Sequence, residues 1–149
     1  MDQSIPYLVV SIFNFQWGLQ ILINAYFSKQ NTRIMKIISL SDVEKKEVHM
    51  EGAVGAWRQL PLGSGDGTPV YSYRVFTVEP GGHTPYHNHP YEHMNYVIEG
   101  TGALVNEAGE ETPLKTGDFA LVNPSEKHQY RNKGDKPFKM ICGVPKEFE

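Results

Sequence analysis

Three histidines, His87, His89 and His93, stand at even spacing within residues 80–100. In an extended strand successive side chains alternate faces, so residues two and four positions apart project to the same side. Three imidazoles on one face can close on a single metal ion, because neutral imidazole is a common metal ligand. Pro90, which lacks a backbone donor, suits a bend that brings His93 back toward the other two. The alternative is that each histidine is a surface or hydrogen-bonded residue without a ligand role.

The segments that would hold these histidines are short strands with alternating apolar and polar residues. Turns rich in glycine and proline separate them, and no helical periodicity competes after residue 50. The predicted strands cover residues 70–79, 92–99, 103–106, 112–115, 119–122, 128–131 and 138–144. Short strands spaced about 8–12 residues apart predict an all-β fold, an antiparallel sandwich or barrel. Residues 61–69 are predicted as a loop that precedes this barrel.

Composition narrows the class of protein. The chain's 149 residues are enough for one domain with a hydrophobic core. Acidic residues outnumber basic ones, 17 to 14, and no run of lysine or arginine occurs, which indicates no nucleic acid and no anionic membrane as a partner. Cys142 is the single cysteine, so no disulfide can form within the chain, which fits a reducing, cytoplasmic location.

Residues 1–34 differ in character from the rest of the chain. Between Gln3 and Ser28 there is no charged residue and no histidine, a length that could span a bilayer. Asparagines and glutamines interrupt the apolar run and no basic cluster flanks it, so a membrane anchor and a secretory signal are both disfavoured. We interpret residues 1–34 as an N-terminal extension, either an upstream start that is not used or a segment that packs elsewhere. Residues 35–149 form the predicted domain, and a membrane anchor is the remaining alternative.

Two blocks of the sequence together resemble the paired motifs of the cupin superfamily. The first motif is a glycine, His-x-His, an acidic position and a second glycine, and it matches residues 81–100 through His87 and His89. The second runs from a glycine through a proline and a histidine to an asparagine. It matches residues 117–132 and puts His128 at the histidine position. The resemblance implies a jelly-roll barrel (a double-stranded β-helix) around one metal ion, commonly as a homodimer.

Two positions depart from the cupin pattern. The acidic position of the first motif, seven residues before Gly100, is His93 in this chain. In the second motif Pro124 falls one place late, and Glu126 stands near the usual glycine. With His93 the chain resembles the small single-domain cupins that bind manganese through four histidines. This resemblance implies one divalent metal ion, manganese in the first place, with the ligands His87, His89, His93 and His128.

Three further residues are candidates for the wall of a pocket at this site. Asn95 follows His93 by two positions, and Tyr130 follows His128 by two, so each shares a strand face with a proposed ligand. Cys142 alternates with Lys139, which must face water, and this places the cysteine on the interior face. Each of the three could instead be an ordinary core residue.

The resemblance leaves two classes of function open. A metal held by neutral imidazoles keeps its full charge and favours anionic oxygen ligands. This suits a metal-dependent enzyme of the oxygenase type that acts on a small, oxygen-rich molecule. No general acid or base is identifiable in the motifs, so a non-catalytic cupin that binds a metal or a small ligand, as a sensor or storage module, is the alternative. Nitrogen ligands by themselves favour copper, nickel or zinc, so iron, cobalt and these metals stay open beside manganese.

Overall fold

The computed structural model describes residues 35–149 of the chain. The interpretation of residues 1–34 as an extension lies outside the described residues. Residues 37–149 form one compact unit. None of the helices among the described residues has the length and apolar character that crossing a membrane would require.

The described residues form an all-β structure of antiparallel strands, as the sequence predicts. The strands are β1 (Lys46–Glu47), β2 (Val54–Leu62), β3 (Tyr71–His83), β4 (His93–Glu99), β5 (Thr101–Val105), β6 (Glu111–Lys115), β7 (Phe119–Val122), β8 (Gln129–Arg131) and β9 (Phe138–Pro145). The helices of residues 35–149 are short 3-10 turns at Leu40–Asp42, Ser64–Asp66 and Lys146–Phe148.

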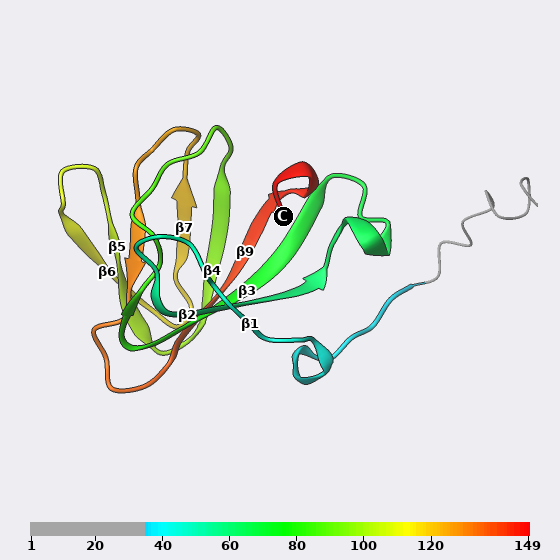
Figure 1. Ribbon diagram of the computed structural model, residues 1–149, viewed down its shortest axis with the longest axis horizontal. Coiled ribbons are helices and arrows are strands. Elements are labelled where there is room, and N and C mark those ends of the chain that lie inside the picture. Colours follow the sequence, from blue (N-terminus) through cyan, green and yellow to red (C-terminus); the bar gives the residue numbers. More distant parts are fainter. Residues whose placement is uncertain (1–34) are drawn as a thin grey trace, which may run out of the picture. The chain divides into compact units, whose positions relative to one another are not determined.

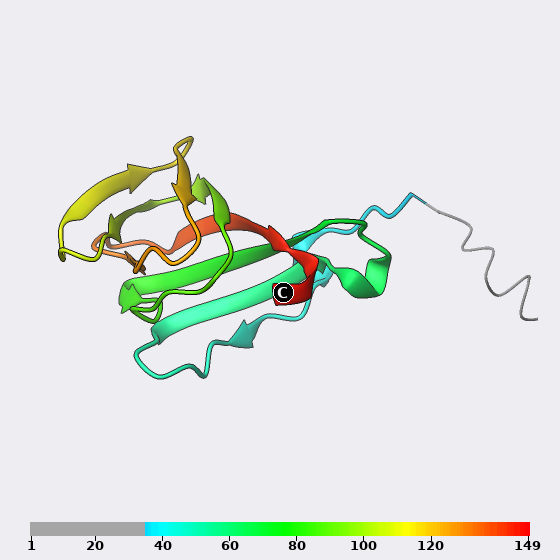
Figure 2. The ribbon, with the colours of Figure 1, turned by 90° about the horizontal axis from the view of Figure 1, so that it is seen from above.

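Strand β3 connects the two ends of a curled sheet, because it pairs with β9 along one part of its length and with β8 at its far end. Residues 71–78 of β3 pair with β9, and His83 at the far end of β3 pairs with Arg131 of β8. The strand order is β6-β5-β8-β3-β9-β4-β7, with β2 also paired to β3 and β1 beside β2. Figure 1 shows β3 and β9 side by side, and Figure 2 shows the sheet curling from β2 and β3 through β9 toward β6 and β7. The result is the expected jelly-roll barrel.

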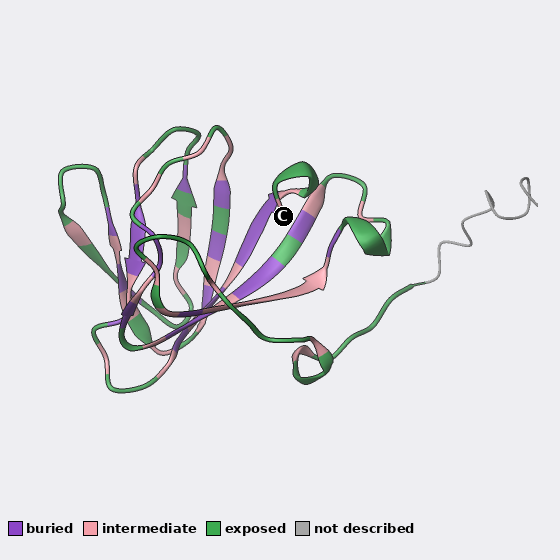
Figure 3. Ribbon diagram, in the orientation of Figure 1, coloured by how far each residue is buried: buried purple, intermediate pink, exposed green. Residues whose placement is uncertain are grey.

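Alternation along the strands separates an interior face from an outer face (Figure 3). In β4, His93, Asn95 and Val97 are buried, whereas Met94 between them is exposed. The interior is partly apolar, and its core cluster consists of Val78, Val97, Leu114, Val122, Tyr130, Phe138 and Met140. Strand β4 therefore places the imidazole of His93 and the amide of Asn95 in the interior beside this core. These polar groups need partners there, since a buried polar group without a hydrogen bond costs free energy.

The barrel begins earlier in the chain than the sequence predicts. Strand β2 pairs with β3, for example Ala56 with Val78 and Arg58 with Phe76. The predicted loop at residues 61–69 therefore starts inside a strand, and only residues 63–70 connect β2 to β3. Gly55 and Pro61 hide this strand from pattern analysis, because both residues are typical strand breakers. Two register irregularities between β2 and β3 accommodate them.

The outer side of the sheet carries a row of exposed apolar side chains, which we call the outer apolar face. It consists of Tyr73, Met94, Phe119 and Leu121, which are between 41% and 80% exposed. Tyr73 and Met94 both lie opposite Gly143 of β9, and Met94 pairs with Leu121, so the row crosses four neighbouring strands. Phe119 packs against Tyr96 at 4.6 Å between ring centroids. Contiguous exposed apolar patches of this kind are typical of interaction surfaces.

Candidate metal centre

Four histidines are positioned by the junction of β3, β4 and β8. His87 and His89 lie in the segment between β3 and β4, His93 is the first residue of β4, and His128 precedes β8. The backbones of His87 and His128 form an isolated antiparallel bridge, in which each N–H donates to the other's carbonyl at 3.1 and 2.9 Å. This bridge fastens the two predicted motifs together. The ligating nitrogens of His87, His89 and His128 all lie within 4.8 Å of one another.

Backbone carbonyls fix which nitrogen of each clustered histidine carries the proton. Nδ1 lies 3.0 Å from the Pro85 carbonyl in His87, 2.7 Å from the Tyr91 carbonyl in His89, and 2.9 Å from the Glu126 carbonyl in His128. A carbonyl oxygen only accepts, so Nδ1 must donate and Nε2 must hold the lone pair. Such outer contacts orient histidine ligands in metal sites.

The three-histidine cluster fits a metal ion by its own chemistry. Nε2 of His89 is buried and has no hydrogen-bond partner among the described residues. A buried lone pair without a partner is costly unless something binds it. With the Nε2 atoms of His87 and His128 beside it, this atom completes a set of neutral nitrogen donors that suits a divalent transition metal. His87, His89 and His128 would hold the ion.

The loop before His128 shows how the chain tolerates its departure from the second motif. Ser125 takes a φ of 69°, the only positive φ outside glycine among the described residues. Its N–H donates to the His89 carbonyl at 2.7 Å, and the Glu126 carboxylate accepts from the Asn123 N–H at 2.8 Å. The left-handed conformation usual for glycine is thus taken by serine, and two hydrogen bonds hold it. His128 stays in place as a result.

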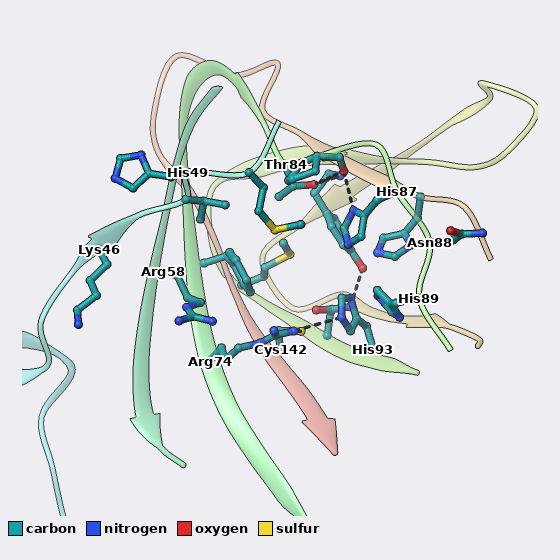
Figure 4. Close-up of a pocket in the computed structure, with 18 of the residues that line it drawn as sticks. Lys46, His49, Arg58, Arg74, Thr84, His87, Asn88, His89, His93 and Cys142 are labelled. Atoms are coloured by element: carbon teal, nitrogen blue, oxygen red, sulfur yellow. Dashed lines mark hydrogen bonds between the residues drawn. The ribbon is translucent and has the colours of Figure 1, made fainter. Parts of the chain in front are cut away.

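His93, the fourth predicted ligand, stands beside the cluster but is not joined to it. Its ring lies 4.1 Å from the His89 ring and 5.2 Å from the His128 ring, centroid to centroid. Its Nε2 lies 3.1 Å from Nη2 of Arg74 (Figure 4). Arginine only donates, so Nε2 of His93 accepts this hydrogen bond with its one lone pair. In this arrangement the His93 lone pair points at Arg74 rather than at the cluster.

Burial keeps the imidazoles of His89, His93 and His128 neutral. Desolvation, followed by the charge of Arg74, lowers the pKa of His93 from its ordinary value to about 2. Desolvation likewise lowers the pKa of His128 to about 4 and lowers that of His89. At neutral pH these rings are therefore free bases, which is the form that binds metals.

The histidines line one side of a cavity of about 580 Å³. The three predicted pocket residues, Asn95, Tyr130 and Cys142, line the same cavity. Nδ2 of Asn95 donates to the Tyr130 hydroxyl at 2.6 Å, whereas Oδ1 of Asn95 is buried without a partner in residues 35–149. Burial raises the pKa of the Tyr130 hydroxyl and of the Cys142 thiol, so both groups are neutral. The cavity thus offers a ligand unsatisfied polar atoms within a mostly apolar wall.

The residue that sequence reasoning missed is Arg74, on β3. It is 6% exposed, lines the cavity, and stands opposite Cys142 in the pairing of β3 with β9. The sequence does indicate a buried charge here. Arg74 is the single charged residue between Val70 and Val78, and it shares its strand face with Phe76. The other histidines are less central. His83 lies outside the cavity lining and contacts Gln129, and His49 is exposed at the cavity's edge.

Similarity to known proteins agrees with this geometry. A family model described as a cupin domain matches residues 74–144. An L-ectoine synthase of Mycolicibacterium gilvum is 30% identical over 95 residues, which are 63% of this chain and 72% of that protein. Gentisate 1,2 dioxygenase 1 of Aquipseudomonas alcaligenes is 34% identical over 65 residues, which are 44% of this chain and only 19% of the dioxygenase.

Solved structures share the same architecture. The polyketide cyclase RemF from Streptomyces resistomycificus is 26% identical, with a TM-score of 0.71 over 75% of this chain and 80% of that one. A cupin 2 domain-containing protein from Halorhodospira halophila is 30% identical, with a TM-score of 0.58 over 68% of this chain and 75% of that one.

Removal of a clustered histidine should abolish stoichiometric metal uptake. We expect His89→Ala and His128→Ala to weaken Mn²⁺ binding by more than the about 10- to 100-fold that loss of an orienting partner costs. Metal content after dialysis against limiting Mn²⁺ would be measured by mass spectrometry, with circular dichroism to confirm folding. The exposed His49→Ala is the matched control and should bind normally. Full occupancy in His89→Ala would contradict the assignment of the cluster.

The metal-free protein should lose stability as the pH falls below about 6.5, the pKa of an unfolded histidine. His93 and His128 stay neutral in the fold while the unfolded chain takes up protons, so stability rises with pH in this window. Each histidine should contribute about 1.4 kcal/mol per pH unit between pH 6.5 and 4. Urea unfolding at several pH values measures this slope. His93→Gln should flatten it and His49→Gln should not, and equal slopes in all three proteins would refute the expectation.

Proposed function

The chain belongs to the cupin superfamily, and from this premise we propose that it is a metal-dependent enzyme of the oxygenase type that acts on a small, oxygen-rich molecule. The observation that carries the proposal is the convergence of the lone pairs of His87, His89 and His128 at the wall of a cavity of about 580 Å³. That volume is typical of sites for small molecules. The similarity to a gentisate 1,2 dioxygenase supports the oxygenase class.

The proposed resident metal is manganese, held by the three clustered histidines with His93 as the fourth ligand. The support for His93 is its position, since its ring centroid lies 4.1 Å from that of His89, closer than the rings of His87 and His128. A divalent ion on neutral nitrogen ligands would supply a Lewis acid with open positions for oxygen ligands. His93 can serve only if its lone pair turns away from Arg74, since it has no second one.

The remaining side chains of the cavity would bind and orient the substrate. Phe76 and Met140 give it an apolar wall that limits the entry of water. The Asn95 amide is anchored at one end by the Tyr130 hydroxyl, and its free Oδ1 can accept a hydrogen bond from a substrate hydroxyl. The site thus offers an oriented acceptor beside the metal ligands, and this suits a hydroxylated or enolic substrate.

A second function is a non-catalytic metal- or ligand-binding cupin, a sensor or storage module. One observation favours it. Among the described residues that line the cavity, Glu47 is the single carboxylate, so no carboxylate pair for general acid and base catalysis is present. A binding protein needs no such pair, whereas an enzyme that relies on general acid and base catalysis needs groups that take and give protons.

Oxygen consumption separates these two functions. Protein purified without chelator and loaded with Mn²⁺ should consume oxygen with one class among 1,2-diketones, enediols and phenols, as recorded with an oxygen electrode. His128→Ala, assayed in parallel, should fall to the rate of the metal-free protein because a ligand is missing. Tight binding of metal and of a test compound without any turnover, across all three classes, would exclude the oxygenase and leave the binding module.

We also propose that the protein is a homodimer that covers the outer apolar face. Each chain carries the same row of exposed apolar side chains, so a twofold axis can bring two rows together. Light scattering after size-exclusion chromatography should give the mass of a dimer. Phe119→Lys should give a monomer, because a charge cannot be buried there without cost. Val54→Lys, at an exposed apolar residue of β2, is the control. A monomeric wild type, or a dimer insensitive to Phe119→Lys, would refute this proposal.

A further inference from the structure

Arg74 is a buried cation without an anionic partner. Its side chain is 6% exposed, and it takes part in none of the ion pairs among the described residues. Nη2 donates to Nε2 of His93 at 3.1 Å and to Sγ of Cys142 at 3.2 Å, and the guanidinium lies 5.2 Å from the centre of the Phe76 ring. Nε is buried and has no partner in residues 35–149. Its positive charge is therefore uncompensated.

The neighbours of Arg74 cannot supply the missing negative charge. His93 is a neutral acceptor in this arrangement, since a protonated ring could not accept a hydrogen bond from arginine. Burial raises the pKa of the Cys142 thiol, although the charge of Arg74 acts in the opposite direction, so the sulfur stays protonated. Both contacts are hydrogen bonds to neutral groups.

A buried guanidinium cannot relieve this cost by losing its proton, because arginine stays charged in proteins. Taking such an ion out of water is costly, and only an anion with well-formed hydrogen bonds offsets the penalty. Because His93 and Cys142 take the two Nη2 hydrogens, the Nε–H is the donor that remains for an oxygen of an anion. The chemistry of Arg74 therefore calls for an anion inside the cavity.

The charge of the cavity wall agrees with this requirement. Lys46, Arg58 and Arg74 line the cavity together with the single carboxylate of Glu47, and Lys46 is paired at 3.0 Å with Glu44, which lies outside the lining. Arg58 forms no hydrogen bond or ion pair through its guanidinium in the described part of the chain. Figure 4 shows Arg58 and Arg74 on the side of the cavity that faces His87, His89 and His93. An anion that enters meets cations on one side and the neutral metal ligands on the other.

We propose that the ligand of this cavity is a small carboxylate whose carboxylate group binds the orphaned Nε edge of Arg74. The proposal rests on the function proposed above and names the substrate class of that site. His93 contacts both sides, since its Nε2 lies 3.1 Å from Nη2 of Arg74 and its ring centroid lies 4.1 Å from that of His89. One molecule of metabolite size thus reaches from the guanidinium to the metal ligands, with its body against Phe76 and Met140. Arg74 is the residue that binds the carboxylate group of this substrate.

The test compares two ligands of equal shape and unequal charge. Benzoate and benzamide differ in the anionic group and share an apolar ring, which suits the wall of this cavity. Calorimetric titration of the metal-free protein should show benzoate binding about 10- to 100-fold more tightly than benzamide, the range expected for a hydrogen-bonded charge pair. The Arg74 Nε–H signal in a proton–nitrogen correlation spectrum should shift with benzoate and not with benzamide. This comparison needs no variant and no metal.

Variants of Arg74 test whether the preference for benzoate depends on this side chain. Arg74→Met, which keeps the length of the side chain, should remove the preference for benzoate, and Arg74→Lys should restore part of it. Lys127→Met, outside the cavity, should change nothing. If Arg74→Met fails to fold, Arg74→Lys and the spectrum of the wild type carry the test.

Equal affinity for benzoate and benzamide, or an unmoved Nε–H signal, would overturn the inference. Tighter binding of inorganic phosphate than of benzoate would also overturn it, because the anion would then be a phosphate. These outcomes are separate from failure of the proposed function. Loss of the metal-dependent oxygen uptake leaves benzoate binding to the metal-free protein intact, whereas absent benzoate binding leaves metal content and oxygen uptake untouched.

Discussion

A neutral imidazole has one lone pair, and the arrangement of this site follows from where the fold directs each of them. In His87, His89 and His128 a backbone carbonyl accepts a hydrogen bond from Nδ1–H, so the lone pair of each ring sits on Nε2 and faces its neighbours. His93 has the same chemistry but a different partner, since Arg74 occupies its Nε2. The three clustered histidines thus differ from His93 in the partner of Nε2. The partner of His93 is Arg74, a cation that lacks a counter-charge.

Strand β3 links Arg74 to the segment that carries the clustered histidine His128. Its N-terminal part pairs with β9 and places Arg74 opposite Cys142, while its last residue pairs with β8 next to the segment that carries His128. Asn95 of β4 also stands opposite Cys142, so Arg74, Cys142 and Asn95 form one row across three neighbouring strands. The row is polar, and the apolar cluster around Phe138 and Met140 must offset the cost of burying it.

The sequence predicts those parts of the molecule that local spacing controls. Period-two alternation located β3 to β9, and the two motifs brought together His87, His89 and His128. Strand β2 escaped because Gly55 and Pro61 break its pattern, and only its pairing with β3 makes it a strand. The contact between Arg74 and His93 was not predicted, because it depends on the register between strands that are far apart in the chain. No local sequence pattern encodes that register. Spacing alone could therefore not decide whether His93 joins the cluster.

Each carbonyl that orients a clustered histidine belongs to a residue two positions away in the chain, namely Pro85, Tyr91 and Glu126. The donor set is thus built from short local segments, whereas the cations of the cavity come from β1, β2 and β3. Substitutions of Lys46 or Arg58 can change which molecules enter without disturbing the rings of His87, His89 and His128, whereas Arg74 also holds the lone pair of His93. Because of this separation, the molecules that the cavity admits can change in evolution while the three-histidine cluster stays the same.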